Sequence, residues 1–183
     1  LAEEEVLTGE SIGDVRFFHP DRLVTRGEFV AMALTAAGMD KSMPAVLNTG
    51  LFDDDTIPAW LKSYVTQAID TGIFSGSVNG KGYRVAEAER VITRGEAAVI
   101  INAVLEPRAD SAAAVFADHD TIPVWAYTAA SNMKNAGIMV GMSDGSLCQG
   151  RSLDRAQAAV ILYNMMCCLK KNGEGALLSW AKN

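Results

Sequence analysis

The stretch LVTRGEFVAMA at residues 23–33 and the stretch VITRGEAAVII at residues 91–101 share the tetrapeptide Thr-Arg-Gly-Glu directly ahead of an apolar run. A Thr at a helix N-cap followed three residues later by Glu forms a capping box, in which two side chains satisfy backbone N–H groups reciprocally. Such a cap contributes about 1 kcal/mol to helix stability. The pattern predicts two helices that are capped by the pairs Thr25–Glu28 and Thr93–Glu96.

The arginine inside each tetrapeptide needs another explanation, because a cation in the first turn opposes the helix dipole. A third copy, LDRAQAAVIL at residues 153–162, keeps this arginine as Arg155. In that copy Asp154 replaces the threonine and Gln157 replaces the glutamate, and both residues suit the same capping roles. The arginine is retained while its neighbours change, which indicates a role other than capping.

The chain repeats itself beyond these helix starts. The hexapeptide DTIPAW at residues 55–60 returns as DTIPVW at residues 120–125, which is 120 − 55 = 65 positions later. The same offset relates further pairs, namely Asp53 and Asp118, Trp60 and Trp125, and Gly72 and Gly137. Self-similarity at a fixed period indicates units that bury their apolar faces against one another.

Each unit has the pattern of two helices joined by a glycine-rich loop. Pro58 and Pro123 suit a first helical turn, and the glycines Gly72 and Gly137 fall where a helix C-cap is expected. The first helix of repeat two carries an apolar stripe at helical spacing, formed by Trp60, Leu61, Tyr64, Val65, Ala68 and Ile69. The capped second helices are apolar around most of their circumference and are expected to be largely buried. The sequence therefore predicts one mainly helical domain, with short strand pairs in the loops at most.

Composition excludes some classes of function. The chain has 183 residues, 49% of them hydrophobic, and a formal net charge of −6. Nucleic acid is an unsuitable partner because binding to phosphates needs a basic face. The apolar runs are too short to cross a membrane, so no membrane insertion is expected. The first residues lack a basic segment followed by an apolar one, and we expect any secretion signal to have been removed or to lie outside this chain.

Catalytic, metal and cofactor chemistry find little support among the residue types present. The two histidines, His19 and His119, have no nucleophile or metal-ligand partner at a recognisable spacing. The acidic run at residues 53–55 lacks the glycine and the trailing glutamate of a calcium loop, and is expected to cap a helix in solvent. The odd set Cys148, Cys167 and Cys168 makes a poor disulfide framework, and the last two are expected to be buried thiols. We predict a protein that is not an enzyme and needs no cofactor or metal.

Taken together, these motifs resemble the S-layer homology module, the repeat that anchors bacterial surface proteins to the cell wall. The matching pieces are FADHDTIPVWAYTAA, AGIMVGMSDG and VITRGEAAVI. The resemblance implies a mainly α fold with three helix-loop-helix repeats in a pseudo-threefold arrangement around a central helical bundle built from the first helices. It also implies an extracellular location, in the cell wall or surface layer of a bacterium.

In that family, grooves between the repeats bind secondary cell-wall polysaccharide, which often carries a pyruvate ketal. The resemblance therefore implies a partly exposed ligand-binding arginine in each repeat, namely Arg26, Arg94 and Arg155. A guanidinium matches a carboxylate with two parallel hydrogen bonds, and the free N–H groups at the helix start are expected to favour the same anion. Weaker candidates are Gly9, Gly72 and Gly137, together with Trp60 and Trp125, which we expect first as core anchors.

The chain departs from the family pattern in two places. Asp154 stands beside Arg155 and is expected to neutralise part of that anion site. Repeat one (1–38) lacks its first half, whereas repeat two (51–105) and repeat three (116–171) are complete. We hypothesise that the tail at 172–183, with Trp180, supplies the missing half-helix and that residues 1–8 continue it.

One rival interpretation assigns these repeats to protein–protein assembly in a bacterial surface layer rather than to glycan binding. Under either interpretation the module would belong to a larger parent protein, through which self-association could also arise.

Overall fold

A computed structural model describes residues 6–7, 10–12, 15–41, 43–106 and 115–171, and this part of the chain is mainly helical. Its five α-helices are α1 (Arg26–Ala36), α2 (Ala59–Asp70), α3 (Arg94–Leu105), α4 (Val124–Asn135) and α5 (Arg155–Lys171). Two short 3-10 helices precede α2 and α4, at Asp54–Thr56 and His119–Thr121. The strands form two antiparallel hairpins, β1 (Glu10–Ile12) with β2 (Val15–Phe17) and β3 (Ser77–Val78) with β4 (Arg84–Val85). The predicted helices and loop strands are thus confirmed.

The helix caps follow the sequence prediction at two of three starts. Both predicted capping boxes are complete, Thr25–Glu28 at α1 and Thr93–Glu96 at α3. At α5 the Asp154 carboxylate accepts a hydrogen bond from the backbone N–H of Gln157 at 2.8 Å. The reciprocal half is missing there, because the side-chain oxygen of Gln157 is buried without a hydrogen-bond partner.

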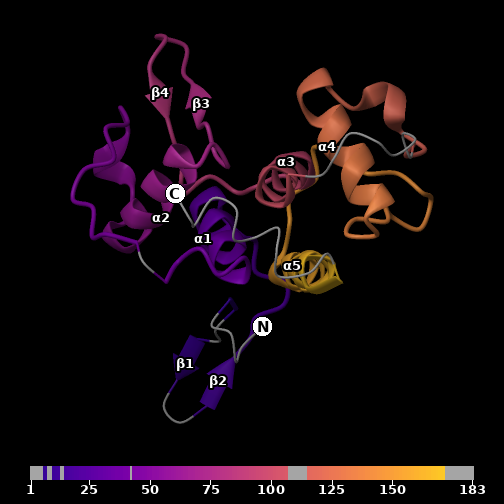
Figure 1. The fold of residues 1–183 in the computed structure, drawn as a ribbon, viewed down its shortest axis with the longest axis horizontal. Helices are drawn as coiled ribbons and strands as arrows, with labels where there is room; N and C mark the ends of the chain where they lie inside the picture. Colours follow the sequence, from indigo (N-terminus) through magenta and orange to yellow (C-terminus); the bar gives the residue numbers. More distant parts are fainter. Residues whose placement is uncertain (1–5, 8–9, 13–14, 42, 107–114, 172–183) are drawn as a thin grey trace.

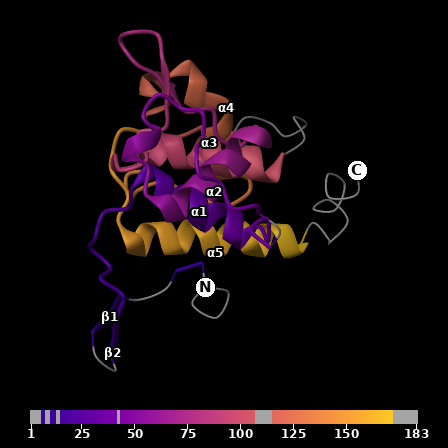
Figure 2. The same cartoon turned by 90° about the vertical axis from the view of Figure 1, so that its left-hand side faces the viewer.

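The centre of the domain is formed by the three capped helices α1, α3 and α5 (Figure 1). Helix α1 packs against both α3 and α5, while α2 packs on α1 and α4 packs on α3. Figure 2 shows the central helices lying one above the other in similar directions. The expected central bundle is therefore present, but it consists of the second helices of the repeats. The expectation that the first helices build it is wrong, because the first helices α2 and α4 pack on the outside of α1 and α3.

A closed ring of backbone hydrogen bonds joins the starts of the three central helices. The N–H of Val24 donates to the carbonyl of Leu153 at 3.0 Å, and the N–H of Leu153 donates to that of Ile92 at 3.2 Å. The N–H of Ile92 completes the ring by donating to the carbonyl of Val24 at 3.0 Å. All three residues are fully buried. Three equivalent segments bonded head to tail make the arrangement pseudo-threefold, as predicted.

The first N–H groups of each central helix bond to a loop of the next repeat. Arg26 donates to the carbonyl of Arg90 at 2.8 Å, and Gly27 donates to that of Ala88 at 2.9 Å. The same pair of bonds recurs from α3 to Arg151 and Gln149, and from α5 to Arg22 and Pro20. These N–H groups are therefore occupied by the protein itself. The expectation that they face a bound anion is wrong for the first two positions of each helix.

The hypothesis that the C-terminal tail completes repeat one falls largely on residues 1–5 and 172–183, which lie outside the described residues. Within the described part, Val6 and Leu7 form a bend rather than the expected helix, and both side chains are buried.

Candidate ligand grooves between the repeats

The three predicted arginines are buried rather than partly exposed. Arg26, Arg94 and Arg155 have relative exposures of 5%, 6% and 6%. Each lies in the first turn of a central helix, where the loop of the next repeat covers it. The sequence-based expectation of exposed arginines was wrong because a capping pattern does not reveal which chain segment packs over the helix start.

Two cavities contain a predicted arginine. The first, which we call the Arg26 groove, has a volume of about 410 Å³. It is lined by Arg26, the loop at 72–77, four residues of α3 and Trp125 of α4. The second, the Arg155 groove, has a volume of about 440 Å³ and lies between α1, α2 and the start of α5. Its lining includes Arg155, Phe18, His19, Glu28, Trp60 and Tyr64.

The two grooves are built from corresponding positions. When α1 and α3 are aligned at their N-caps, the groove residues of the two helices correspond. Glu28 corresponds to Glu96, and the further pairs are Ala31 and Val99, Met32 and Ile100, and Thr35 and Ala103. Each groove also receives an arginine from the preceding central helix and a tryptophan from the following repeat. Every groove thus combines residues of all three repeats, although these residues are far apart in the sequence.

A smaller cavity of about 140 Å³ lies at the corresponding place in repeat three, between the end of α4 and α5. It contains Gly137 and Asn164, whose counterparts Gly72 and Ala103 line the Arg26 groove. Gly72 and Gly137 follow the last residues of α2 and α4 with φ of +74° and +69°, as expected of helix C-caps. The remaining candidate, Gly9, lies outside the described residues.

The two tryptophans are exposed rather than core anchors. Trp60 and Trp125 each have a relative exposure of 56%, and each forms part of a groove wall. The apolar stripe of α2 does enter the core, but through Leu61, Val65 and Ala68. A tryptophan that keeps more than half of its surface in solvent offers an apolar face to a ligand.

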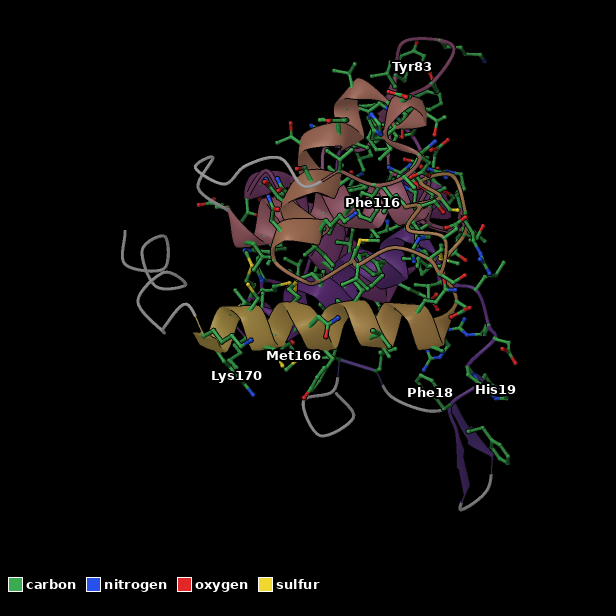
Figure 3. The ribbon with its side chains drawn as sticks, turned by 90° about the vertical axis from the view of Figure 1, so that its right-hand side faces the viewer. Phe18, His19, Tyr83, Phe116, Met166 and Lys170 are labelled. Atoms are coloured by element: carbon green, nitrogen blue, oxygen red, sulfur yellow. The ribbon has the colours of Figure 1, made fainter. Side chains whose placement is uncertain are left out.

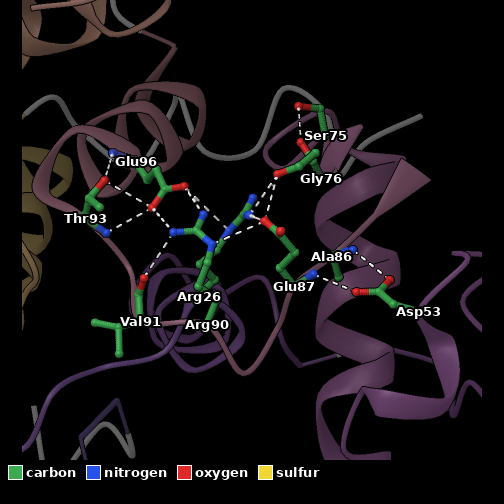
Figure 4. A network of polar contacts seen from close by, with 11 residues as sticks. Arg26, Asp53, Ser75, Gly76, Ala86, Glu87, Arg90, Val91, Thr93 and Glu96 are labelled. Carbon is green, nitrogen blue, oxygen red and sulfur yellow. Dashed lines mark hydrogen bonds and ion pairs between the residues drawn. The ribbon is translucent and has the colours of Figure 1, made fainter. Parts of the chain in front are cut away.

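The Arg26 guanidinium lies in a network of acidic side chains (Figure 4). Its Nη1 donates to Glu87 at 2.7 Å and to the hydroxyl of Ser77 at 2.9 Å. The Nε atom is buried without an acceptor, and the nearest Glu96 oxygen lies 3.9 Å away. Burial lowers the pKa of Arg26, while Glu96 and Glu87 oppose that shift. The arginine is therefore held as an internal ion pair.

Arg90 and Glu96 complete this network. They form an ion pair, and Arg90 also contacts Glu87 at 3.2 Å. Burial raises the pKa of Glu96, but hydrogen bonds from Arg90 and from the backbone of Thr93 outweigh it and place the pKa below its ordinary value. The network holds two cations and two carboxylates, so its formal charge is balanced.

Arg94 and Arg155 have a different arrangement. The Nε of Arg94 donates to the carbonyl of Leu147 at 2.7 Å, and the Nε of Arg155 donates to that of Phe18 at 2.9 Å. Figure 3 shows Phe18 and His19 close to the start of α5, and the Arg155 guanidinium lies 5.1 Å from the Phe18 ring centre. Burial lowers the pKa of both arginines. Among the described residues, no carboxylate lies within ion-pair distance of Arg94.

Asp154 caps the start of α5 by accepting a hydrogen bond from the backbone N–H of Gln157. The expectation that Asp154 neutralises part of the Arg155 site stays a prediction.

Two aspartates of the repeated motif have a role that sequence reasoning missed. The Asp53 carboxylate accepts hydrogen bonds from the backbone N–H groups of Ala86 and Glu87, at 2.8 and 2.7 Å. Asp118 binds the backbone of Leu147 and Cys148 in the same way, at 2.7 and 2.9 Å. Both clamps fix a loop that faces a central arginine. The recurrence of Asp53 and Asp118 at the repeat offset was the available signal.

The remaining acidic and thiol groups also differ from the expectation of solvated caps and buried thiols. Asp54 is buried and binds Lys62 and Thr49, which lowers its pKa to about 2. Cys167 and Cys168 are only half-buried. Within the described residues there is no cluster of three or more His, Cys, Asp or Glu side chains that could hold a metal ion. No helix in that part of the chain has the length and apolarity of a bilayer span.

The fold and the grooves define a mainly α module in which three equivalent helix starts surround one axis. No family model matches the chain. Segments of known proteins are nevertheless similar to it. The chain is 28% identical over 161 residues, or 85% of its length, to an amylopullulanase of Thermoanaerobacterium thermosulfurigenes. It is 29% identical over 153 residues, or 84% of its length, to a surface-layer 125 kDa protein of Lysinibacillus sphaericus.

A third similar segment belongs to the exoglucanase XynX of Acetivibrio thermocellus, which is 33% identical over 96 residues, or 51% of this chain. The chain covers only 8%, 12% and 8% of the lengths of these three relatives, in the order given. The similarity therefore concerns small portions of large bacterial proteins that are named for surface-layer or polysaccharide-degrading roles.

Proposed function

We propose that this chain is a non-catalytic anchoring module of the S-layer homology type, which binds secondary cell-wall polysaccharide in the grooves between its repeats. In this proposal repeat one spans 1–38, repeat two spans 51–105 and repeat three spans 116–171. The proposed location is extracellular, in the cell wall or surface layer of a bacterium. The ligand-binding residues are Arg26, Arg94 and Arg155, with Trp60 and Trp125, and with Gly9, Gly72 and Gly137 at the helix ends.

The observation that carries the proposal is the equivalence of the Arg26 groove and the Arg155 groove. Both place a buried arginine and a half-exposed tryptophan around a cavity of about 400 Å³. Two similar grooves on one axis suit a polymer whose chemical unit repeats. The similarity to a segment of a surface-layer protein supports the same assignment.

The residue types fit an acidic sugar. A tryptophan face packs against the apolar face of a pyranose ring, and a guanidinium offers paired donors to a carboxylate such as that of a pyruvate ketal. The chain has a net charge of −6, so attraction of an anionic polymer depends on these local arginines rather than on overall charge.

The proposal is tested by co-sedimentation with purified sacculi from the three bacteria that supplied the relatives. The sacculi are used intact and after removal of the polymers that are not peptidoglycan. We expect the chain to sediment with at least one intact preparation and to stay in solution with the stripped one. The double variant Trp60→Ala/Trp125→Ala is expected to sediment less, while its free energy of unfolding changes by no more than about 1–2 kcal/mol. Binding that survives stripping would contradict the proposal and favour peptidoglycan or a protein as the target.

The rival function, assembly with another surface protein, predicts a different result in the same assay. In that case sedimentation depends on protein that remains attached to the sacculi, so protease treatment of the intact preparation removes it. Removal of the wall polysaccharide after protease treatment would then have no further effect.

A further inference from the structure

Three residues with left-handed backbone occupy equivalent places opposite the central arginines. His19, Glu87 and Cys148 have φ of 51°, 50° and 52°. The residues directly before them are Phe18, Ala86 and Leu147. The carbonyl of Phe18 accepts a hydrogen bond from Arg155 Nε, and the carbonyl of Leu147 accepts one from Arg94 Nε. We call the place held by His19, Glu87 and Cys148 the facing position. Its backbone is the same in all three repeats, but its side chain is an imidazole, a carboxylate or a thiol.

In repeat two the facing side chain binds its arginine directly. The Glu87 carboxylate accepts from Arg26 at 2.7 Å and also contacts Arg90 at 3.2 Å. Arg26 is also the one central arginine whose Nε has lost its carbonyl acceptor, although that Nε remains buried. The guanidinium has thus turned toward carboxylates supplied by the chain itself. An incoming anion would have to displace them.

In repeat three the corresponding place holds no carboxylate. Arg94 faces Cys148, and the first-turn glutamate of the other repeats is replaced by Gln157. The second arginine of the repeat-two network, Arg90, has a counterpart in repeat three. This counterpart is Arg151, whose carbonyl accepts from the N–H of Arg94 as that of Arg90 accepts from Arg26. The nearby Asp118 uses both carboxylate oxygens to bind the backbone of Leu147 and Cys148. Repeat three thus keeps the two arginines of the network but has no counterpart of the carboxylates of Glu87 and Glu96.

The Arg94 side chain is also incompletely satisfied. Its one hydrogen bond within the described residues is the bond from Nε to Leu147, and its terminal nitrogens have no partner there. The residue is nevertheless only 6% exposed. With no carboxylate of the described residues within ion-pair distance, this largely buried guanidinium gains from a ligand that supplies one.

We call the contact between a central arginine and the loop of the next repeat a repeat junction. We propose that the side chain at the facing position decides whether a repeat junction accepts an anion, and that the Arg94 junction is a carboxylate-binding site of this chain. The Arg26 junction is closed to anions because Glu87 already occupies it, so its groove accepts an uncharged sugar. This inference rests on the proposed function in taking an acidic glycan as the natural ligand. It adds that the Arg94 junction binds the carboxylate of the glycan, and that the residue at the facing position determines whether a junction can bind one.

The first test uses a small acidic probe, the 4,6-pyruvate ketal of a methyl hexopyranoside. Its methyl ester is the uncharged control compound. Side-chain ¹⁵N NMR of the arginines, assigned with Arg26→Lys and Arg94→Lys, reports each junction separately. We expect the acid to shift the Nε signal of Arg94 more than that of Arg26, and the ester to leave the Arg94 signal in place. An equal response at Arg26, or no response at Arg94, would overturn the inference.

The second test exchanges the facing residues. Cys148→Glu places a carboxylate opposite Arg94, and Glu87 shows that this backbone conformation accepts a glutamate. We expect the affinity of the acid probe for Arg94 to fall about tenfold or more, as for loss of a charge-assisted contact. The matched control Cys148→Ser leaves the junction uncharged and should bind like the wild type. Glu87→Cys should create a response at Arg26. Unchanged binding by a folded Cys148→Glu variant would refute the role of the facing position.

Failure of this inference and failure of the proposed function give different results. Sedimentation with sacculi that persists in Cys148→Glu and in Arg94→Lys would refute the charge-reading role of repeat three and leave glycan binding intact. A probe response at Arg94 without sedimentation on any intact sacculus would support the anion site and refute anchoring to wall polysaccharide.

Discussion

The backbone N–H of Val24 donates to the carbonyl of Leu153 at 3.0 Å, so the first and the last central helices begin side by side. Both residues are fully buried, and Ile92 completes the ring between them. Because every repeat start is bonded to the other two, no repeat can keep its native environment when another unfolds. The three repeats should therefore behave as one cooperative unit.

We expect a single calorimetric transition whose van't Hoff and calorimetric enthalpies agree. Leu153→Ala should lower that transition as a whole, by about 2–5 kcal/mol in the free energy of unfolding, since it removes a buried leucine at the axis. Val124→Ala is the control, because Val124 is 94% exposed. Two resolved transitions in the wild type would contradict the cooperative ring.

Gly27 and Gly95 occupy the same position of the Thr-Arg-Gly-Glu motif but differ in the space around them. A Cβ added at Gly27 would lie 2.6 Å from Cδ1 of Leu61, a fully buried side chain with little room to move. At Gly95 its closest neighbour would be the side-chain oxygen of Gln149, at 3.1 Å. The third repeat already carries Ala156 at this position.

Gly27→Ala should therefore destabilise the domain by about 1–3 kcal/mol through overpacking. Gly95→Ala should cost distinctly less, because a flexible half-buried side chain can shift. Urea unfolding of the two variants measures the difference, and a larger loss for Gly95→Ala would show that the contact with Leu61 is not limiting.

Asp54 predicts a defined loss of stability in acid. Its hydrogen bond from Lys62, followed by those from Thr49, lowers its pKa to about 2, below the value of an unfolded chain. A carboxyl group with a depressed pKa contributes stability above its unfolded pKa, and that contribution is lost as the pH falls through the folded value. The stabilisation should thus be complete above about pH 5 and should disappear toward pH 2.

Urea unfolding of the wild type and of Asp54→Asn between pH 6 and pH 2 checks this expectation. The difference in the free energy of unfolding should be largest at pH 6 and should shrink as the pH falls. A difference that stays constant over this range would show that the charge of Asp54 does not contribute.

Trp60 and Trp125 should be dispensable for folding and important for binding. Because each is 56% exposed, alanine at either position should change the free energy of unfolding by only about 0.5–1 kcal/mol. Binding of the uncharged methyl ester probe should weaken clearly, since the stacking face is lost. Tyr127→Ala serves as the control, because Tyr127 lies on α4 and lines neither groove. A large loss in the free energy of unfolding, together with unchanged binding of the probe, would show that the two tryptophans have a structural role instead.

Much of the fold was predictable because its signals are local. The capping boxes at Thr25 and Thr93, and the C-cap glycines Gly72 and Gly137, depend on residues within one helical turn. The repeat of the DTIP segment required only a comparison of the chain with itself. Such patterns fix where helices begin and end, and they fixed the number of repeats.

The candidate site was predictable only in part. The sequence by itself determined that an arginine recurs at each central helix start, because the position survives while its neighbours change. Tertiary structure decided that these arginines are buried, that the tryptophans line grooves, and that Glu87 binds Arg26 while Cys148 faces Arg94. The physical reason is that burial, ion pairing and cavity walls depend on which segments meet across the pseudo-threefold axis. Those segments lie many residues apart, so no local pattern records their contact.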